Sequence, residues 1–201
     1  RETSELHVVY RDRLPVHAEG YMTHLITDCS IDFIERNKNK PFFLFVSHEC
    51  PHFPFQGPKD VKKEVNKTNW MKPDADTYVA MLEDLDSEVG RLLAVLDKHK
   101  LTKKTLVVFV SDNGGFADAA NMGPFSGAKS TTLEGGIRVP LIVHWPGHTK
   151  ANTTSQAIVT GTDYYPTLLG MLGLPALPQQ HVDGKSFIPA IKSKPYDRGA
   201  I

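Results

Sequence analysis

Leu106-Val107-Val108-Phe109-Val110-Ser111-Asp112-Asn113-Gly114-Gly115 is the stretch that decides the fold. Its first five residues are apolar and predict a buried strand. The strand ends in a carboxylate and an amide, and the glycines let the backbone turn away without steric cost. Ligands bind at this edge of open α/β sheets, and such oxygens suit a hard cation such as calcium or magnesium. Asp-Asn-Gly is also ordinary turn chemistry, and taken alone the motif favours a simple turn.

The composition is that of a globular chain. Hydrophobic residues make up 40% of the 201 residues, and 23 Lys plus Arg balance 23 Asp plus Glu. A net charge of zero predicts neither a nucleic-acid surface nor a polybasic membrane patch, and no apolar run approaches the about 20 residues that span a bilayer. The polar start Arg1-Glu2-Thr3 has no initiator Met and shows no signal peptide, so we expect the chain to begin inside a longer protein.

Periodicity predicts an α/β fold. Apolar spacing predicts helices and apolar runs predict strands, and either Asp74 or Asp76 is suited to cap the second helix. Strands separated by helices predict a mostly parallel sheet covered by helices on both faces. We expect residues 1–201 to form a single domain. The expected helices are 21–36, 76–99, 162–172 and 186–192, the expected strands are 42–46, 105–111 and 140–145, and 51–75 is expected to be a long surface loop.

Three further expectations concern side chains of the two first helices and the loop between them. Cys29 falls among the apolar positions of the first helix and is expected to be a small buried hydrophobe. The acidic residues of the second helix lie off its apolar stripe, which predicts a solvated face; they are Glu83, Asp84, Asp86 and Glu88. A Cys/His metal site at Cys50 is not favoured, because further ligands at zinc spacing are lacking.

The loop after strand 42–46 contains Pro51-His52-Phe53-Pro54. The prolines stiffen the backbone and exclude a helix, so His48 and His52 are not expected to form a helical metal pair. A fixed His52 can donate a hydrogen bond to an anion or a proton to a leaving group. The alternative is a loop histidine whose hydrogen bonds are made by the backbone.

The loop after strand 105–111 contains Gly127-Ala128-Lys129 and then Glu134-Gly135-Gly136-Ile137-Arg138. Lys129 lies among small residues that allow close backbone approach, where an ammonium can bind an oxyanion as a point charge. The alternative is an ordinary solvated lysine. Glu134 and Arg138 are interpreted as structural, because an arginine four residues after a glutamate is placed to pin a tight loop.

These motifs together resemble the sulfatase family of the alkaline-phosphatase-like superfamily. The ordered set is Pro41-Phe42-Phe43-Leu44-Phe45-Val46-Ser47 with Pro51–Pro54, then Val110–Gly114, Gly127–Lys129 and Glu134–Pro140, and Asp183-Gly184-Lys185-Ser186 is similar to the stretch that closes the family's catalytic region. Each motif is short, but four in order on the expected strand-to-loop junctions form a specific pattern. The resemblance runs from about Tyr21 to about Phe187.

The resemblance implies a hydrolase of sulfate esters that uses a formylglycine made from a cysteine and one divalent cation, usually calcium, with magnesium as the alternative. Asp112 and Asn113 match two of the family's metal ligands, and His52 and Lys129 match residues that contact the sulfate and the leaving oxygen. The implied substrates are sulfated sugars or aryl sulfates. Family members are periplasmic, extracellular or lysosomal, and no nucleic acid or membrane span is implied.

The chain departs from the family pattern in its nucleophile. Neither Cys29-Ser30-Ile31 nor Cys50-Pro51-His52 matches the Cys-x-Pro-Ser-Arg or Cys-x-Ala-Ser-Arg motif, and the paired aspartates of the family's N-terminal half are absent. We therefore expect the C-terminal portion of a catalytic domain, inactive by itself, whose other partner is the missing N-terminal half. Two alternatives remain open: a phosphodiesterase or phosphonate hydrolase of the same superfamily, and a non-catalytic module that binds a partner or a sulfated glycan.

Overall fold

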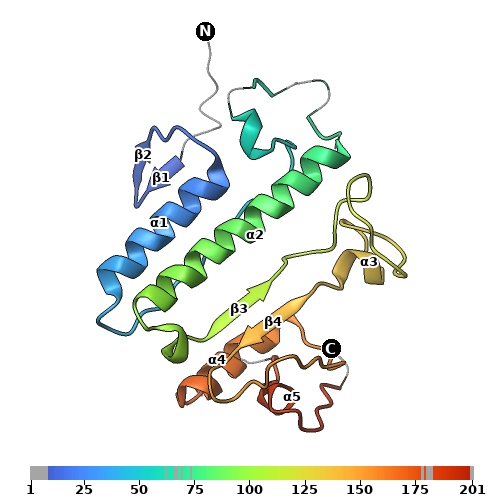
Figure 1. The fold of residues 1–201 in the computed structure, drawn as a ribbon. Helices are drawn as coiled ribbons and strands as arrows, with labels where there is room; N and C mark the ends of the chain where they lie inside the picture. The colour runs from blue at the N-terminus through green and yellow to red at the C-terminus, as the bar shows by residue number, and fades with distance from the viewer. Residues whose placement is uncertain are drawn as a thin grey trace. The chain divides into compact units, whose positions relative to one another are not determined.

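The computed structural model describes residues 9–61, 63–65, 68, 70–72, 74–177, 179 and 183–199 (Figure 1). The chain divides into two compact units. The first comprises Arg1–Thr102 and Asp112–Val139, and the second comprises Lys103–Ser111 and Pro140–Ile201. Because two compact units can belong to one domain, the single-domain interpretation of residues 1–201 stays a prediction.

Two long helices form the body of the first unit. They are α1 (Met22–Asn37) and α2 (Ala75–Lys98), which confirms the helices expected at 21–36 and 76–99. Asp74 is the N-cap of α2: its carboxylate accepts from the amide of Thr77 at 3.3 Å and from the hydroxyl of Thr77 at 2.8 Å. Such a cap satisfies donors that a helix N-terminus otherwise leaves unpaired.

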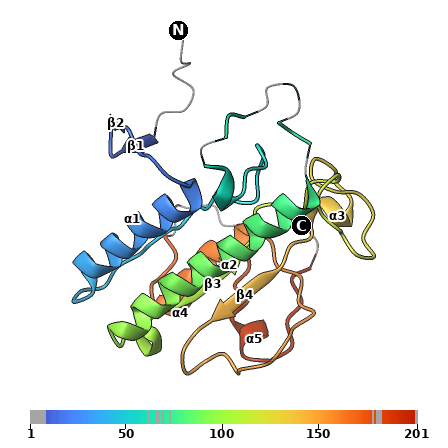
Figure 2. The same ribbon diagram turned by 45° about the horizontal axis from the view of Figure 1, so that its top comes forward.

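The helices α1 and α2 lie side by side (Figures 1 and 2). A hydrogen bond joins His24 and Asp84 at 2.8 Å, and ion pairs join Asp28 and Arg91 at 2.7 Å and Glu35 and Lys98 at 3.0 Å. Residue numbers rise together along both helices, so the two helices run in the same direction. The chain between them therefore has to return from the C-terminal end of α1 to the N-terminal end of α2.

The buried face of α1 differs from the expected apolar stripe. Its buried residues are Thr23, Thr27, Ser30 and Ile34. The hydroxyl of Thr27 donates to the carbonyl of Thr23 at 3.0 Å, and back-bonding of this kind satisfies a hydroxyl without a partner on another element. Small side chains can thus face α2, and Cys29, expected to be buried, is exposed.

The acidic face of α2 is solvated only in part. Glu83 and Asp86 are exposed as expected, but the side chain of Asp84 is only 14% exposed and Glu88 is buried. Both turn towards α1, where His24 Nε2 lies 2.8 Å from Asp84 and 3.9 Å from Glu88. The expectation was wrong for these two residues because helical periodicity does not reveal that the neighbouring helix supplies a histidine as a polar partner.

Residues 42–46 have no helix or strand assignment and belong to no ladder among the described residues. Phe43 is 77% exposed and Phe45 is 79% exposed. The buried strand expected here was therefore wrong: side chains alternate between half-buried and exposed, but the described residues hold no partner strand. The ladder of the first unit lies earlier, between β1 (Val9–Arg11) and β2 (Leu14–Val16), which pair antiparallel.

The second unit contains β3 (Val107–Val110) and β4 (Leu141–His144), close to the strands expected at 105–111 and 140–145. They pair antiparallel, with Val107 opposite His144, whereas parallel pairing was expected. A parallel pair needs a long crossover, usually a helix, and the connection here holds only the four-residue α3 (Glu134–Ile137). Val108, Phe109 and Val110 are 39–40% exposed rather than buried.

The helices of the second unit confirm the patterns at 162–172 and 186–192. The short 3-10 turn η4 (Gly161–Asp163) leads into α4 (Tyr164–Leu172), and α5 (Ile188–Ile191) follows later. Two further 3-10 turns lie among the described residues: η2 (Pro58–Asp60), within the expected loop, and η3 (Thr102–Lys104). In the part of the chain that the structure describes, no helix is long and apolar enough to cross a membrane.

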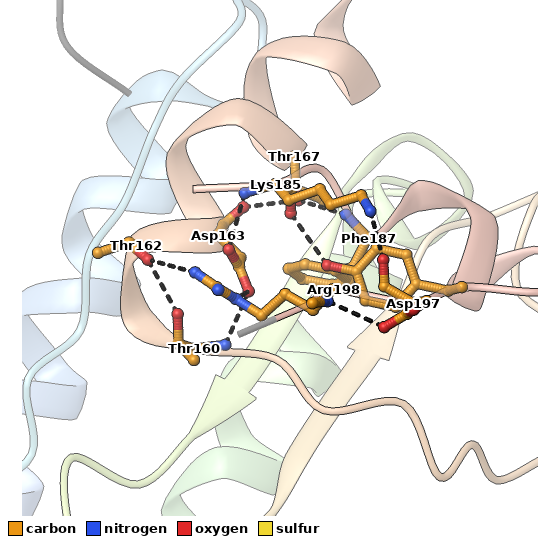
Figure 3. Close-up of polar contacts among 10 residues, drawn as sticks. Thr160, Thr162, Asp163, Thr167, Lys185, Phe187, Asp197 and Arg198 are labelled. Carbon is orange, nitrogen blue, oxygen red and sulfur yellow. Dashed lines mark hydrogen bonds and ion pairs between the residues drawn. The ribbon is translucent and has the colours of Figure 1, made fainter. Parts of the chain in front are cut away.

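Asp163 is the centre of a buried polar network in the second unit (Figure 3). Its side chain is fully buried, and Arg198, 6% exposed, donates from Nε at 2.8 Å. The amides of Lys185 and Thr160 donate to the same carboxylate at 2.8 and 2.9 Å. Burial alone raises the pKa of this carboxyl, but the Arg198 guanidinium and the two amides outweigh burial and hold it below its ordinary value.

Candidate active site

His52 lies on an exposed loop of the first unit. Residues 41–57 contain no helix, as Pro51 and Pro54 predict. His52 Nδ1 lies 2.7 Å from the carbonyl oxygen of Phe53. Because a carbonyl can only accept, Nδ1 carries the proton of this hydrogen bond. The ring is thus oriented by the backbone, and Nε2 is the nitrogen left to meet a ligand.

The residues just before His52 fasten this loop to α2. The thiol of Cys50 donates to the carbonyl of Met81 at 3.1 Å, and burial, aided by the charge of Asp84, raises the pKa of this thiol to about 11. Burial also lowers the pKa of His48, so its neutral ring is favoured. The protonated Cys50 thiol therefore anchors the loop through its bond to Met81 and is not a nucleophile, since a reactive cysteine needs thiolate character.

Asp112 and Asn113 follow β3 and are adjacent in the first unit. The Asp112 side chain is exposed, and Asn113 Nδ2 donates to its Oδ2. The next residue is tied down, because the amide of Gly114 donates to the carbonyl of Gly136 at 2.9 Å. The pair therefore stands on an anchored turn rather than on a loose loop.

Lys129 is held in the same loop system by backbone contacts. Its amide donates to the carbonyl of Gly115 at 2.9 Å, and the amide of Gly135 donates to the carbonyl of Ser126 at 2.8 Å. A Cβ on Gly114 would lie 1.9 Å from the carbonyl oxygen of Gly135. This close approach of backbones requires glycine. Together with the bond from Lys129 to Gly115, it holds the Lys129 loop against the Asp112–Asn113 turn.

Glu134 and Arg138 form the expected i,i+4 ion pair at 3.1 Å. Both side chains are more than half exposed, so the pair contributes little to stability. Arg138 also lies over the ring of Phe125, 4.6 Å from its centroid. The expected ion pair is present, and the structural role of these two residues stays a prediction.

A cluster of aromatic rings joins the two candidate loops, and sequence reasoning missed it. The His52 ring lies 4.0 Å from the ring of Phe53, measured between centroids, and the ammonium of Lys129 lies 5.9 Å from the same ring. Phe116, just after the Asp112–Asn113 turn, lies 5.8 Å from Phe53. The available signal was Phe53 itself, between the prolines that flank His52.

The four predicted site residues are therefore placed in one compact unit. Phe53 contacts both His52 and Lys129, and backbone hydrogen bonds join the Lys129 loop to the Asp112 turn. Carboxylate and amide oxygens are the donors that a hard divalent cation prefers, so the Asp112–Asn113 pair fits such an ion in kind. Two residues are fewer ligands than calcium takes, and no group of three or more His, Cys, Asp or Glu with metal-binding geometry occurs among the described residues.

Comparison with known proteins places the chain beside sulfatases. A family profile described as Sulfatase matches residues 1–174. Arylsulfatase G of Rattus norvegicus is 32% identical over 186 residues, which are 85% of this chain and 34% of that protein. The crystal structure of Ps i-CgsB in complex with k-i-k-neocarrahexaose superposes with a TM-score of 0.82 at 33% identity, and covers 94% of this chain and 42% of the other.

The comparisons also bear on the fold and on one alternative. The similarity to sulfatase structures supports the α/β, alkaline-phosphatase-like fold expected from the sequence. The phosphonate monoester hydrolase SpPMH from Silicibacter pomeroyi matches less well, with a TM-score of 0.50 at 25% identity over 60% of this chain. The chain spans about a third of the length of the curated relatives it matches.

Proposed function

Because this chain belongs to the sulfatase family, we propose that the protein hydrolyses sulfate esters and that His52, Lys129, Asp112 and Asn113 are its contribution to the catalytic site. The single observation that carries the assignment is the junction of the loops: the ring of Phe53 lies against both His52 and Lys129. The Lys129 loop is in turn bonded to the turn that holds Asp112 and Asn113.

The proposed role of His52 and Lys129 is to bind the sulfate and stabilise the leaving oxygen. The bridging oxygen of a sulfate ester gains negative charge as its bond to sulfur breaks. Positive and hydrogen-bonding groups aimed at that charge lower the barrier. Lys129 supplies a point charge. Since Nδ1 of His52 already donates to Phe53, the protonated ring can give the Nε2 proton to the departing alcohol.

The sulfatase family uses a divalent metal ion and a formylglycine. We assign Asp112 and Asn113 as two ligands of the metal, calcium rather than magnesium, because calcium accepts irregular and numerous oxygen ligands. Such an ion supplies Lewis-acid stabilisation of the sulfate oxygens. In this proposal the turn presents the side-chain oxygens of Asp112 and Asn113 as ligands, next to the Lys129 loop to which backbone hydrogen bonds join it. The nucleophile motif is not found in these 201 residues.

The proposed substrate is a sulfated sugar. Ps i-CgsB, which this chain resembles at 33% identity, was crystallised with an oligosaccharide, k-i-k-neocarrahexaose. The exposed loop of His52 and the aromatic rings beside it suit a ligand that approaches from solvent. A location outside the cytoplasm, as expected from the family resemblance, belongs to the same proposal.

The test is binding of a sulfate ester to the 201-residue chain in the presence of calcium, followed by amide chemical shifts. We expect galactose 6-sulfate to shift the resonances of Lys129 and His52, and Lys129→Ala to weaken binding about tenfold or more. The matched control Lys103→Ala changes an exposed lysine of η3 and should leave binding unchanged. The chain alone should bind without turnover.

The same titration separates the alternatives. Tighter binding of a phosphonate monoester than of the sulfate ester would favour a phosphonate hydrolase. Equal effects of Lys129→Ala and Lys103→Ala would contradict the assignment of Lys129. Turnover of the sulfate ester above a Lys129→Ala control would overturn the expectation that this chain is inactive by itself.

A further inference from the structure

A pocket lies beside the candidate site and is not used by the proposed chemistry. Its lining includes Pro54, Phe55, Gln56, Lys63, Trp70 and Lys72, all in the first unit. Its volume is about 210 Å³, below the about 300–1,000 Å³ of pockets that enclose a drug-sized ligand. It is therefore the size of a site for one small unit of a longer ligand.

The pocket is close to His52. The ring of Phe53 lies 4.0 Å from His52 and 5.1 Å from Trp70, measured between centroids. These two steps place the indole no farther than about 9 Å from the imidazole. A ligand whose sulfate reaches His52 can thus extend to Trp70 with its next unit.

One wall of the pocket is aromatic and held in place. Trp70 is 41% exposed, and its ring meets Phe53 edge-on with an interplanar angle of 79°. Phe55 contacts Tyr78 of α2 at 5.9 Å and Phe116 at 5.9 Å. An exposed indole fixed by such ring contacts offers a flat apolar surface at low entropic cost.

The rim of the pocket is polar and of mixed charge. Asp60 accepts from the amide of Gly57 at 3.0 Å and pairs with Lys63, and Gln56 donates to the carbonyl of Lys63 at 2.9 Å. Lys72 forms no ion pair with another described residue. The rim therefore presents both donors and acceptors above an apolar wall.

From this arrangement we propose that the Trp70 pocket binds the sugar unit next to the sulfated one, so that the substrate is an oligosaccharide rather than an aryl sulfate. A sugar ring has an apolar C–H face and hydroxyls that both donate and accept, which matches the wall and the rim. An aryl group can use the aromatic wall but offers no hydroxyls to the donors and acceptors of the rim. The proposal rests on the proposed function, because it takes the sulfated unit to be at His52 and Lys129.

The test uses the 201-residue chain carrying Trp145→Phe, which leaves Trp70 as the single tryptophan of the two in the sequence. Its fluorescence then reports on the pocket. The probes are galactose 6-sulfate, a sulfated galactan tetrasaccharide and the same tetrasaccharide without sulfate. We expect both tetrasaccharides to change Trp70 fluorescence, with galactose 6-sulfate leaving it unchanged. The sulfated tetrasaccharide should bind about tenfold or more tightly than the monosaccharide.

Variants identify the contacts. In chains that keep Trp145, binding is followed by amide chemical shifts. Trp70→Ala should remove the advantage of the tetrasaccharide while leaving the affinity for galactose 6-sulfate unchanged. Lys72→Ala should weaken tetrasaccharide binding several-fold. The matched control Lys59→Ala alters an exposed lysine of the same loop that does not line the pocket, and it should have no effect.

The outcomes separate this proposal from the proposed function. If the unsulfated tetrasaccharide binds as tightly as the sulfated one and Lys129→Ala has no effect, the sugar pocket stands and the sulfate site fails. If galactose 6-sulfate binding depends on Lys129 but no tetrasaccharide affects Trp70, the sulfate site stands and the pocket proposal is overturned. Absence of binding by any probe contradicts both.

Discussion

Two aspartates of this chain, Asp163 and Asp112, have opposite surroundings. Asp163 is fully buried and accepts from Arg198 and from the amides of Thr160 and Lys185 (Figure 3). Asp112 is exposed, and the contact it makes is with the amide of its neighbour Asn113.

The difference separates a carboxylate that holds the fold from one that is suited to a ligand. Arg198 and two backbone amides compensate the charge of Asp163, so this carboxylate has no need of a ligand as a partner. Asp112 presents its charge to solvent on a turn that the backbone anchors through Gly114. Stability should therefore depend on Asp163, and binding should depend on Asp112.

Asp163→Ala should produce the largest loss of stability. Truncation leaves the buried Arg198 guanidinium without its counter-charge, and breaking a buried pair in this way costs about 3–5 kcal/mol. The free energy of unfolding can be measured in urea from the fluorescence of Trp145, which lies in the same unit, in a Trp70→Phe background. Asp112→Ala is the control, and an exposed substitution of this kind should stay within about 0.5 kcal/mol. Similar losses for the two variants would break the contrast.

Gly135→Ala should destabilise the Lys129 loop. A Cβ at this position would lie 2.1 Å from the carbonyl oxygen of Gly127, so the backbone has to shift, at a cost of about 1–3 kcal/mol. Gly90→Ala is the matched control, because that helical glycine has no atom within 4 Å of the added methyl and should gain up to about 1 kcal/mol. Hydrogen exchange of the Lys129 amide would report the loosening; unchanged exchange would show that the glycine contact is dispensable.

The stability contributed by Asp163 should be lost in acid. Its pKa is below the ordinary value in the folded state, so the unfolded chain takes up the proton first as pH falls. The contribution is therefore complete above the unfolded pKa of about 3.9 and disappears as pH falls through the folded pKa, at about 1.4 kcal/mol for each unit of difference. Urea midpoints between neutral pH and acid should fall less in Asp163→Asn than in the wild type, and parallel curves would argue against this coupling.

Glu134→Gln should have the smallest effect on stability. The side chains of Glu134 and Arg138 are 58% and 54% exposed, and exposed i,i+4 pairs contribute about 0.3–0.5 kcal/mol. Urea unfolding of this variant, at low and high salt, should differ little from that of the wild type. A loss above about 1 kcal/mol would mean that the ion pair, rather than the glycine contacts, holds the loop.

The sequence predicted the elements better than their packing. Helix α2 could be predicted because its apolar stripe and the cap at Asp74 are local signals. The direction of β4 against β3 could not, since pairing depends on how the long connection returns. The solvation of Asp84 was misjudged because His24 on another helix decides it.

For the candidate site, the strand-to-loop junctions identified His52, Lys129, Asp112 and Asn113, whose roles stay predictions. The contact of Phe53 with Trp70 and Phe116 could not be predicted, because these rings are far apart in the sequence. Tertiary packing alone brings such residues together, so a pattern of residue types along the chain carries no signal for it.

The most direct test of the central claim is a calcium titration of the 201-residue chain, followed by amide chemical shifts. Few oxygen ligands give weak binding, so we expect shifts centred on Asp112, Asn113 and Gly114, with a dissociation constant of about 1 mM, at the weak end for calcium sites. Asp112→Asn should abolish the shifts, and the fold of the second unit should be unchanged. Shifts that avoid this turn, or that persist in Asp112→Asn, would contradict the assignment of Asp112 as a metal ligand.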